Sequence, residues 1–110
     1  MKDLKLQGAA GEALAAALLY GQGYEILEQN YRCRMGEIDL ICRKGDVIEF
    51  IEVKTRLTMD FGRPCEAVGP AKQERMRKVA AYYTTVHGME WMEIRFQVIE
   101  ILVNQIRNAF

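Results

Sequence analysis

The sequence contains no serine, only one histidine and no net charge, and the first two shortages exclude classes of function. Without serine and with only His87, the chain has no material for a serine-type catalytic triad. It also has no Gly-rich phosphate loop of the Walker type. His87 lies near the expected end of a helix, where a cationic cap is its ordinary role. Any chemistry must therefore be sought among the carboxylates and the basic side chains.

Long apolar runs and paired cysteines are also missing. No window reaches the roughly 18 uninterrupted apolar residues of a membrane span. The N-terminus Met1-Lys2-Asp3-Leu4 lacks the apolar stretch of a signal peptide, so we expect a cytoplasmic protein that does not bind a membrane. Cys33, Cys42 and Cys65 have no Cys-x-x-Cys spacing, which argues against a disulfide framework and a thiolate zinc site. Buried or idle thiols are expected.

The composition is that of a globular domain. Half of the 110 residues are hydrophobic and 27% are charged, which predicts one compact domain over residues 1–110. A chain of this size can bury about two thirds of its unfolded surface without a disulfide or metal. Residues 31–78 carry 11 basic and 8 acidic side chains, whereas both flanks are slightly acidic. This asymmetry is too mild to predict a nucleic-acid partner by itself.

The pattern of apolar residues predicts an α/β fold with the order αβββαβ. A helix is expected over residues 4–22, ended by Gly21-Gln-Gly23, with its apolar face at Leu6, Ala10, Ala13, Leu14, Ala17 and Leu18. Strands are expected over residues 24–31, 37–42, 47–55 and 94–103, the middle two joined by a turn at residues 44–46.

A long loop over residues 56–69 precedes a second helix from Pro70 to about Gly88, with Met76, Ala80 and Tyr83 on one face. Long loops inside a small domain are often functional. The aromatic residues Tyr82, Tyr83 and Trp91 are expected in the core. A single mixed sheet flanked by helices follows.

Two pairs of polar side chains lie in the expected hairpin. Glu37 and Asp39 share one strand face, and so do Glu52 and Lys54 on the next strand. The nearly continuous apolar run 47–53 predicts a central strand covered on both faces, so a carboxylate at its end needs an ion pair, hydrogen bonds or a metal. Lys54 can satisfy Glu52, but Asp39 would remain.

An Asp followed thirteen positions later by Glu-x-Lys is the signature of the PD-(D/E)XK nuclease superfamily. The wider pattern is more specific: Gln7-Gly8, Gly11-Glu12, Gly23-Tyr24, Asn30-Tyr-Arg32, Gly36-Glu-Ile-Asp-Leu-Ile41, Phe50-Ile-Glu-Val-Lys-Thr-Arg56 and Lys72. It resembles the YraN-like family of small bacterial proteins, which are predicted endonucleases similar to archaeal Holliday-junction resolvases. The resemblance implies a restriction-endonuclease-like αβββαβ core. Two departures are Ile38 before Asp39, where the superfamily has proline, and Gln97, where many relatives have an acidic residue; the role of Gln97 is open.

The resemblance also implies a metal site. Asp39 and Glu52, with the Val53 carbonyl, would bind Mg²⁺, or Mn²⁺ in its place, because hard oxygen ligands suit these ions. Lys54 would orient the attacking water or stabilise the developing oxyanion. Glu12 resembles an additional carboxylate that completes the metal site or holds a water; alternatively it is only a solvated helix residue.

Three further residues have a functional and an ordinary interpretation. Glu37 is expected to pair with Arg32 or Arg34 and not to bind the metal. Lys72 and Gln73 match the place where many superfamily members put a supporting polar residue, although the first turn of a helix is normally polar.

The expected function is a Mg²⁺-dependent endonuclease that acts on branched or otherwise structured DNA. Its phosphate contacts would come from Arg32, Arg34, Arg56, Arg63, Lys72, Arg75, Arg77 and Lys78. Alternatively, the helical ones among these charges only solvate an outer face. A nucleic-acid-binding module without cleavage activity is the second hypothesis. The third is a protein-interaction domain whose carboxylates are structural, and failure to bind DNA at low salt would favour it. Resolvase-like relatives cut as dimers, and the apolar final strand with Phe110 can serve a homodimer.

Overall fold

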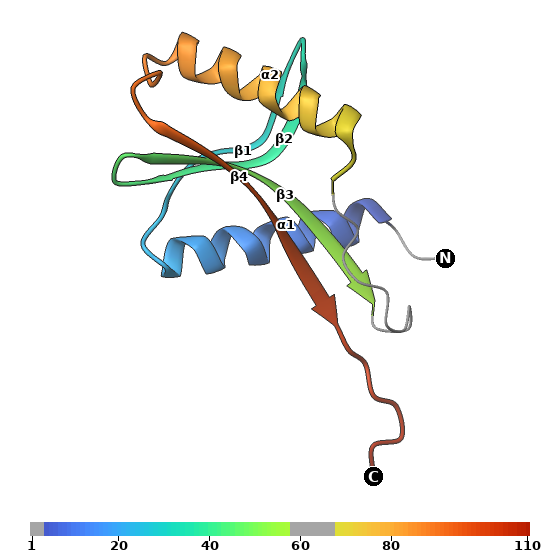
Figure 1. The fold of residues 1–110 in the computed structure, drawn as a ribbon. Coiled ribbons are helices and arrows are strands. Elements are labelled where there is room, and N and C mark those ends of the chain that lie inside the picture. The colour runs from blue at the N-terminus through green and yellow to red at the C-terminus, as the bar shows by residue number, and fades with distance from the viewer. Residues whose placement is uncertain (1–3, 58–67) are drawn as a thin grey trace.

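The structure is a computed structural model, which describes residues 4–57 and 68–110 and the side chains of residues 8–56 and 68–110. The elements follow the predicted order αβββαβ (Figure 1). They are α1 (Leu4–Gly21), β1 (Glu25–Cys33), β2 (Gly36–Lys44), β3 (Val47–Leu57), α2 (Pro70–Val86) and β4 (Glu93–Val103). Gly23, Gly45 and Gly88 have positive φ in the turns that end α1, join β2 to β3 and follow α2.

The four strands form one mixed sheet in the order β1-β2-β3-β4. The pairs β1–β2 and β2–β3 are antiparallel, and β3–β4 is parallel. The two helices cover opposite faces of this sheet (Figure 1). The α/β fold with a mixed sheet flanked by helices, consistent with the αβββαβ core, is therefore confirmed.

A hydrophobic core lies on each face of the sheet. On the α2 face, Ile38, Ile41, Ile48 and Phe50 pack with Met76, Val79, Ala80 and Tyr83. On the α1 face, Leu40, Cys42 and Ile51 pack with Ala15 and Leu19. Burial raises the pKa of the Cys42 thiol to about 12, so this thiol is the inert one that was expected. Cys33 is half-buried, and Cys65 lies outside the described residues.

The buried face of α1 differs from the predicted one. Leu14 and Leu18 are 56% and 49% exposed, while Gly11, Ala15 and Leu19 are buried. A β-carbon on Gly11 would lie 1.9 Å from Thr55 Oγ1, so the helix backbone approaches β3 more closely than any side chain would allow. Gly11 and Ala15 therefore face the sheet in the middle of α1, and Leu14 does not.

The expectation of a buried aromatic cluster was wrong for two of its three members. Tyr83 is buried, but Tyr82 is 44% exposed and Trp91 is 63% exposed. Helical spacing explains Tyr82, because residues 76, 79, 80 and 83 already fill the face of α2 that meets the sheet. Trp91 lies in the turn before β4, where the Arg43 guanidinium stands 5.9 Å from its ring centroid.

His87 is the C-cap of α2, as its position predicted, and its Nδ1 lies 2.9 Å from the Tyr83 carbonyl oxygen. Neither described helix is both long and apolar enough to cross a membrane.

Candidate active site

The candidate site lies where β2 separates from β3. Their pairing ends at Leu40 and Ile51. Ile38 packs toward α2 but Leu40 packs toward α1, although residues two apart in a regular strand share a face. The alternation therefore changes at Asp39, and the Val53 N–H donates to Asp39 Oδ2 at 2.7 Å. The Asp39 carboxylate takes the place of the main-chain acceptor that β2 no longer offers to β3.

The Val53 carbonyl belongs to the same side of the site. In a β-strand, the N–H and C=O of one residue point to the same neighbouring strand. Because the Val53 N–H points to Asp39, the carbonyl points into the same gap between β2 and β3. The role of this carbonyl as a metal ligand, which the resemblance implied, stays a prediction.

Glu52 lies at the α2 side of the gap, where it forms an ion pair with Lys72. Lys72 Nζ lies 2.5 Å from Glu52 Oε1, and the Glu52 side chain is only 13% exposed. A pocket of about 200 Å³ is lined there by both residues together with Gly36, Glu37, Asp39, Arg75 and Met76. The pocket therefore unites three predicted acidic residues with two predicted basic ones. Sequence reasoning named Lys54 as a group that can satisfy Glu52, and the structure shows that Lys72 does so.

Glu12 approaches Asp39 from the opposite face of the sheet. The close contact of Gly11 with Thr55 fixes the position of α1 against β3 and places the next residue, Glu12, beside the site. With its side-chain amide oriented to donate, Asn30 gives hydrogen bonds to both Glu12 oxygens at 2.9 and 3.2 Å. Asn30 has a φ of 53°, a conformation that asparagine tolerates better than most residues. Glu12 is therefore a fixed group of this site and not a freely solvated one.

The electrostatics of Asp39 combine opposing effects. Burial raises the pKa of the Asp39 carboxyl, and the neighbouring Glu12 carboxyl raises it further. The Val53 N–H and the Lys72 ammonium act in the other direction, but they do not compensate fully. Two carboxyl groups with excess negative charge thus meet at the gap, which is an environment that favours a cation.

The donor set suits a hard divalent cation. Asp39, Glu52 and the Val53 carbonyl all offer oxygen, which Mg²⁺ and Mn²⁺ prefer. Across residues 4–57 and 68–110, no three acidic, histidine or cysteine side chains come together closely enough to hold a metal by themselves. An ion here would therefore need the carbonyl and waters as further ligands, as Mg²⁺ usually does.

The family follows from comparison with known proteins. Residues 11–101 match the uncharacterised protein family UPF0102. The UPF0102 protein of Moorella thermoacetica is 46% identical over 99 residues, which cover 90% of this chain and 82% of that protein. The one of Alkaliphilus metalliredigens is 41% identical over 112 aligned residues, covering 96% and 98%. The one of Syntrophus aciditrophicus is 49% identical over 94 residues, covering 86% and 74%. The chain belongs to the UPF0102 family. This confirms the family part of the resemblance, whereas the nuclease superfamily stays a prediction.

The basic residues of this UPF0102 protein fall into two groups. Gly36 at the start of β2 lies against Arg75, since a β-carbon on Gly36 would be 3.8 Å from Arg75 Cβ. Arg75 lines the pocket, and so does Glu37, the ion-pair partner of Arg32. Four basic side chains of the β1–β2 turn region and α2 are exposed: Arg32, Arg34, Arg75 and Lys78.

The other basic residues have different surroundings. Arg56 is paired with Glu100 at 3.4 Å, and Arg77 with Glu74 at 3.7 Å. Lys54 lies opposite Glu100 in the β3–β4 register. Arg63 lies outside the described residues. Glu37 pairs with Arg32 at 3.0 Å, as expected. Gln73 donates to the Val68 carbonyl at 2.7 Å, just beyond the N-terminus of α2.

Sequence reasoning assigned no role to Asn30 or to Gln97. Asn30 stood in the quoted family pattern, and an asparagine inside an expected strand was a usable signal, because strands disfavour it. Gln97 donates to Glu49 Oε1 at 2.7 Å, and the Tyr24 hydroxyl donates to Glu49 Oε2 at 2.7 Å. Glu49 is 7% exposed, so the amide of Gln97 satisfies a buried carboxylate on the α1 face. An acidic residue at position 97 would instead repel Glu49.

Proposed function

We propose that this UPF0102 protein is a metal-dependent endonuclease that hydrolyses phosphodiesters in structured or branched DNA. The observation that carries the proposal is that Asp39, which accepts from the Val53 N–H, and Glu52 line one pocket where β2 and β3 separate. This arrangement matches the Asp and Glu-x-Lys signature of the PD-(D/E)XK nucleases. A cytoplasmic protein that meets DNA directly fits the proposal.

Four side chains at or near the pocket have a proposed role in this reaction: Glu12, Asp39, Glu52 and Lys54. Mg²⁺ or Mn²⁺, when bound, would supply an activated water and neutralise phosphate charge. Asp39 and Glu52 would hold this ion through their carboxylate oxygens. Lys54 orients the attacking water or stabilises the charge that develops on the phosphate oxygens. Glu12, fixed by Asn30, completes the metal site or holds a water.

The substrate follows from the distribution of charge. Arg32, Arg34, Arg75 and Lys78 are exposed, and Arg75 lines the pocket. Such side chains contact phosphates without regard to sequence. A nuclease with phosphate contacts alone selects DNA by shape, which favours branched or distorted DNA over a defined sequence.

A nucleic-acid-binding module without cleavage activity is the second candidate. The ion pair between Lys72 and Glu52 favours it, because this pair satisfies the Glu52 carboxylate without a metal. The two candidates share the basic surface and differ only in whether the bound phosphodiester is cut.

Cleavage of labelled linear, flapped and four-way DNA, with EDTA, Mg²⁺ or Mn²⁺, tests the proposal. We expect metal-dependent cleavage of the flapped and four-way DNA and none by the Asp39→Asn variant. DNA binding at low salt is measured on the same samples. Binding without cleavage under any metal would select the binding module. Absence of binding at low salt would reject both candidates and favour a protein-interaction domain.

A further inference from the structure

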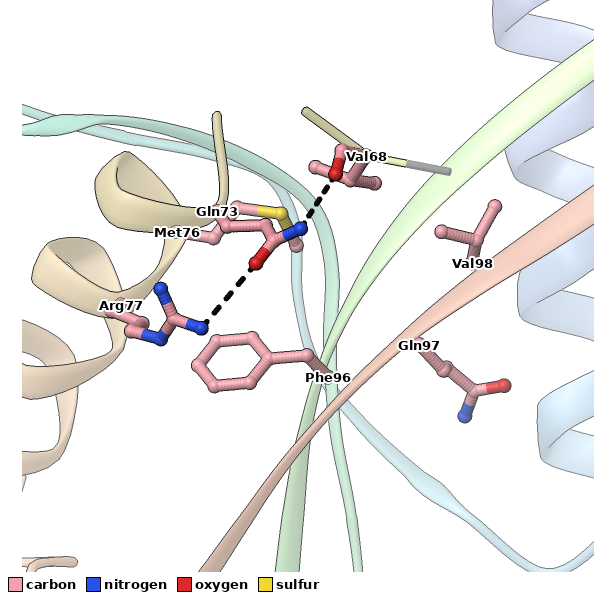
Figure 2. A pocket seen from close by; sticks show the side chains of 7 residues that line it. All are labelled: Val68, Gln73, Met76, Arg77, Phe96, Gln97 and Val98. Carbon is pink, nitrogen blue, oxygen red and sulfur yellow. Dashed lines mark hydrogen bonds between the residues drawn. The ribbon is translucent and has the colours of Figure 1, made fainter. Parts of the chain in front are cut away.

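A second pocket lies beside the candidate active site, between α2 and β4 (Figure 2). It has a volume of about 310 Å³, near the lower limit for small-ligand sites. Its walls include Val68, Met76, Phe96 and Val98, with the polar groups of Gln73 and Arg77 on the α2 side. An occupant would therefore meet an apolar interior and a polar edge.

The two pockets are neighbours. Met76 lines both of them. Val98 is the register partner of Glu52, and Gln73 follows Lys72 on α2. A group that enters the second pocket thus lies next to a phosphate that Lys72 holds beside Glu52. In a nucleic acid, the group attached next to each phosphate is a nucleoside.

The chemistry of the pocket fits a nucleobase. The Phe96 side chain is 42% exposed, and its ring points from β4 toward the Arg77 guanidinium (Figure 2). Aromatic rings and guanidinium planes are the two surfaces on which proteins stack bases. Gln73 donates to the Val68 carbonyl at 2.7 Å and accepts from Arg77 at 3.4 Å. These bonds use one donor and one lone pair of an amide that has two of each, so the amide can still recognise a base edge.

We propose that this pocket receives one unpaired base next to the phosphodiester at the active site; this rests on the proposed function. A base in an intact duplex is stacked on both sides and cannot enter a pocket. Removing it from the stack costs a few kcal/mol, and least when the base is already unpaired. The pocket would therefore make the chain select DNA with an unpaired nucleotide at a branch, flap or mismatch.

The test measures DNA binding in EDTA, so that cleavage does not interfere. One duplex carries a single unpaired 2-aminopurine, and the matched duplex has the same base paired. We expect Phe96→Leu to weaken binding of the unpaired DNA about tenfold, as for loss of one stacked base, and to leave the paired duplex unchanged. Phe96→Tyr, which keeps the ring, should bind both duplexes as the wild type does. Ile94→Ala, an exposed apolar change on the same strand outside the pocket, is the matched control.

A second readout is independent of affinity. 2-Aminopurine fluorescence should fall when the unpaired probe binds the wild type, and fall less with Phe96→Leu. Equal effects of Phe96→Leu on both duplexes, or no effect on either, would overturn the inference. If the wild type still cleaves DNA with Mg²⁺ in that case, only the base pocket is rejected. If the wild type binds neither duplex at low salt, the proposed function is rejected as well.

Discussion

At the scale of single residues, Asp39 has both a structural and a proposed chemical role. Its carboxylate accepts from the Val53 N–H and lies beside the Glu12 carboxyl. Burial and Glu12 raise its pKa above the ordinary value of 3.8. The folded chain therefore binds the Asp39 proton more tightly than the unfolded chain, and stability falls as the pH rises through the folded pKa. At neutral pH the full penalty of the charge is present.

Asp39→Asn removes this penalty and should not lower stability. The amide oxygen of asparagine can still accept from the Val53 N–H. We expect the midpoint of thermal unfolding without metal to equal or exceed that of the wild type at pH 7, with no gain below pH 3.8. Calorimetric titration should show that Asp39→Asn no longer binds Mg²⁺. The same loss of Mg²⁺ binding is expected for Glu52→Gln. Asp46→Asn, in the exposed β2–β3 turn, is the control. Unchanged Mg²⁺ affinity in both site variants would remove the proposed site.

Lys72 competes with a metal for Glu52, because its ammonium already lies on the Glu52 carboxylate. Lys72→Met keeps an apolar stem and removes the charge, which leaves a nearly buried carboxylate unpaired. Mg²⁺ should then bind several-fold more tightly, while DNA binding weakens. The control is Lys78→Met on the exposed side of α2. An Mg²⁺ affinity that Lys72→Met leaves equal or lowers would show that the two cations do not compete.

Lys54 is expected to act on the reacting groups and not on the metal. Lys54→Ala should therefore keep the Mg²⁺ affinity of the wild type and reduce the cleavage rate by at least about a hundredfold, as loss of one electrostatic contact to a transition state does. Single-turnover cleavage with saturating protein measures this rate without the contribution of DNA affinity. Cleavage at the wild-type rate would make Lys54 a structural residue.

At the scale of elements, α1 explains where sequence reasoning succeeded and failed. Helical periodicity predicted the helix, but it placed Leu14 and Leu18 on the buried face. The structure buries Gly11 and Ala15 instead, because the backbone of α1 lies close to Thr55 of β3 and leaves room only for small residues. This close approach also brings Glu12 to the site. The hydrophobicity of side chains does not encode such an approach, so the pattern could not select the right face.

In the candidate site, too, some features could be predicted from the sequence and others could not. That Asp39 and Glu52 line one pocket could be predicted, because the chain places them at fixed spacing on adjacent strands. The pairs Glu52–Lys72 and Glu12–Asn30 join residues about 20 positions apart on different elements. Such partners depend on how the helices meet the sheet, which local patterns do not contain.

Gly11→Ala tests the close approach of α1. Its β-carbon would meet Thr55 Oγ1 at 1.9 Å, so the Thr55 side chain must rotate or the helix must shift, at a cost of about 1–3 kcal/mol for an overpacked contact. Gly8→Ala is the control: its β-carbon meets nothing within 4 Å, and alanine favours the helix. We expect urea unfolding to show lower stability for Gly11→Ala only. Thr55→Ala in the same chain should restore part of the loss, and equal stability of the two glycine variants would reject the contact.

At the scale of the whole molecule, β4 forms an edge of the described sheet. Leu102 and Val103 at its end are 61% and 43% exposed. Unpaired strand edges with apolar residues favour association with another chain. The homodimer that the resemblance raised stays a prediction, and sedimentation at several protein concentrations measures it.

The exposed basic residues form a surface to which two distant parts of the chain contribute: the β1–β2 turn region, with Arg32 and Arg34, and α2, with Arg75 and Lys78. If Arg75 and Lys78 contact a phosphate backbone, replacing both by alanine should weaken linear and branched DNA about equally. The salt dependence of binding should become shallower by about two counterions, one for each lost contact. Mg²⁺ affinity should stay the same, since neither side chain is a metal ligand.

Lys44→Ala with Arg95→Ala is the matched control for this salt experiment. It removes the same charge near the other end of the sheet, where β2 turns into β3. If both double variants change the slope equally, only the net charge matters and the surface is not a binding site. If the slope of the Arg75 and Lys78 variant equals that of the wild type, these charges only solvate α2. The search for the DNA surface would then turn to Arg32 and Arg34, whose side chains are exposed, before Arg56, which is half-buried beside Glu100.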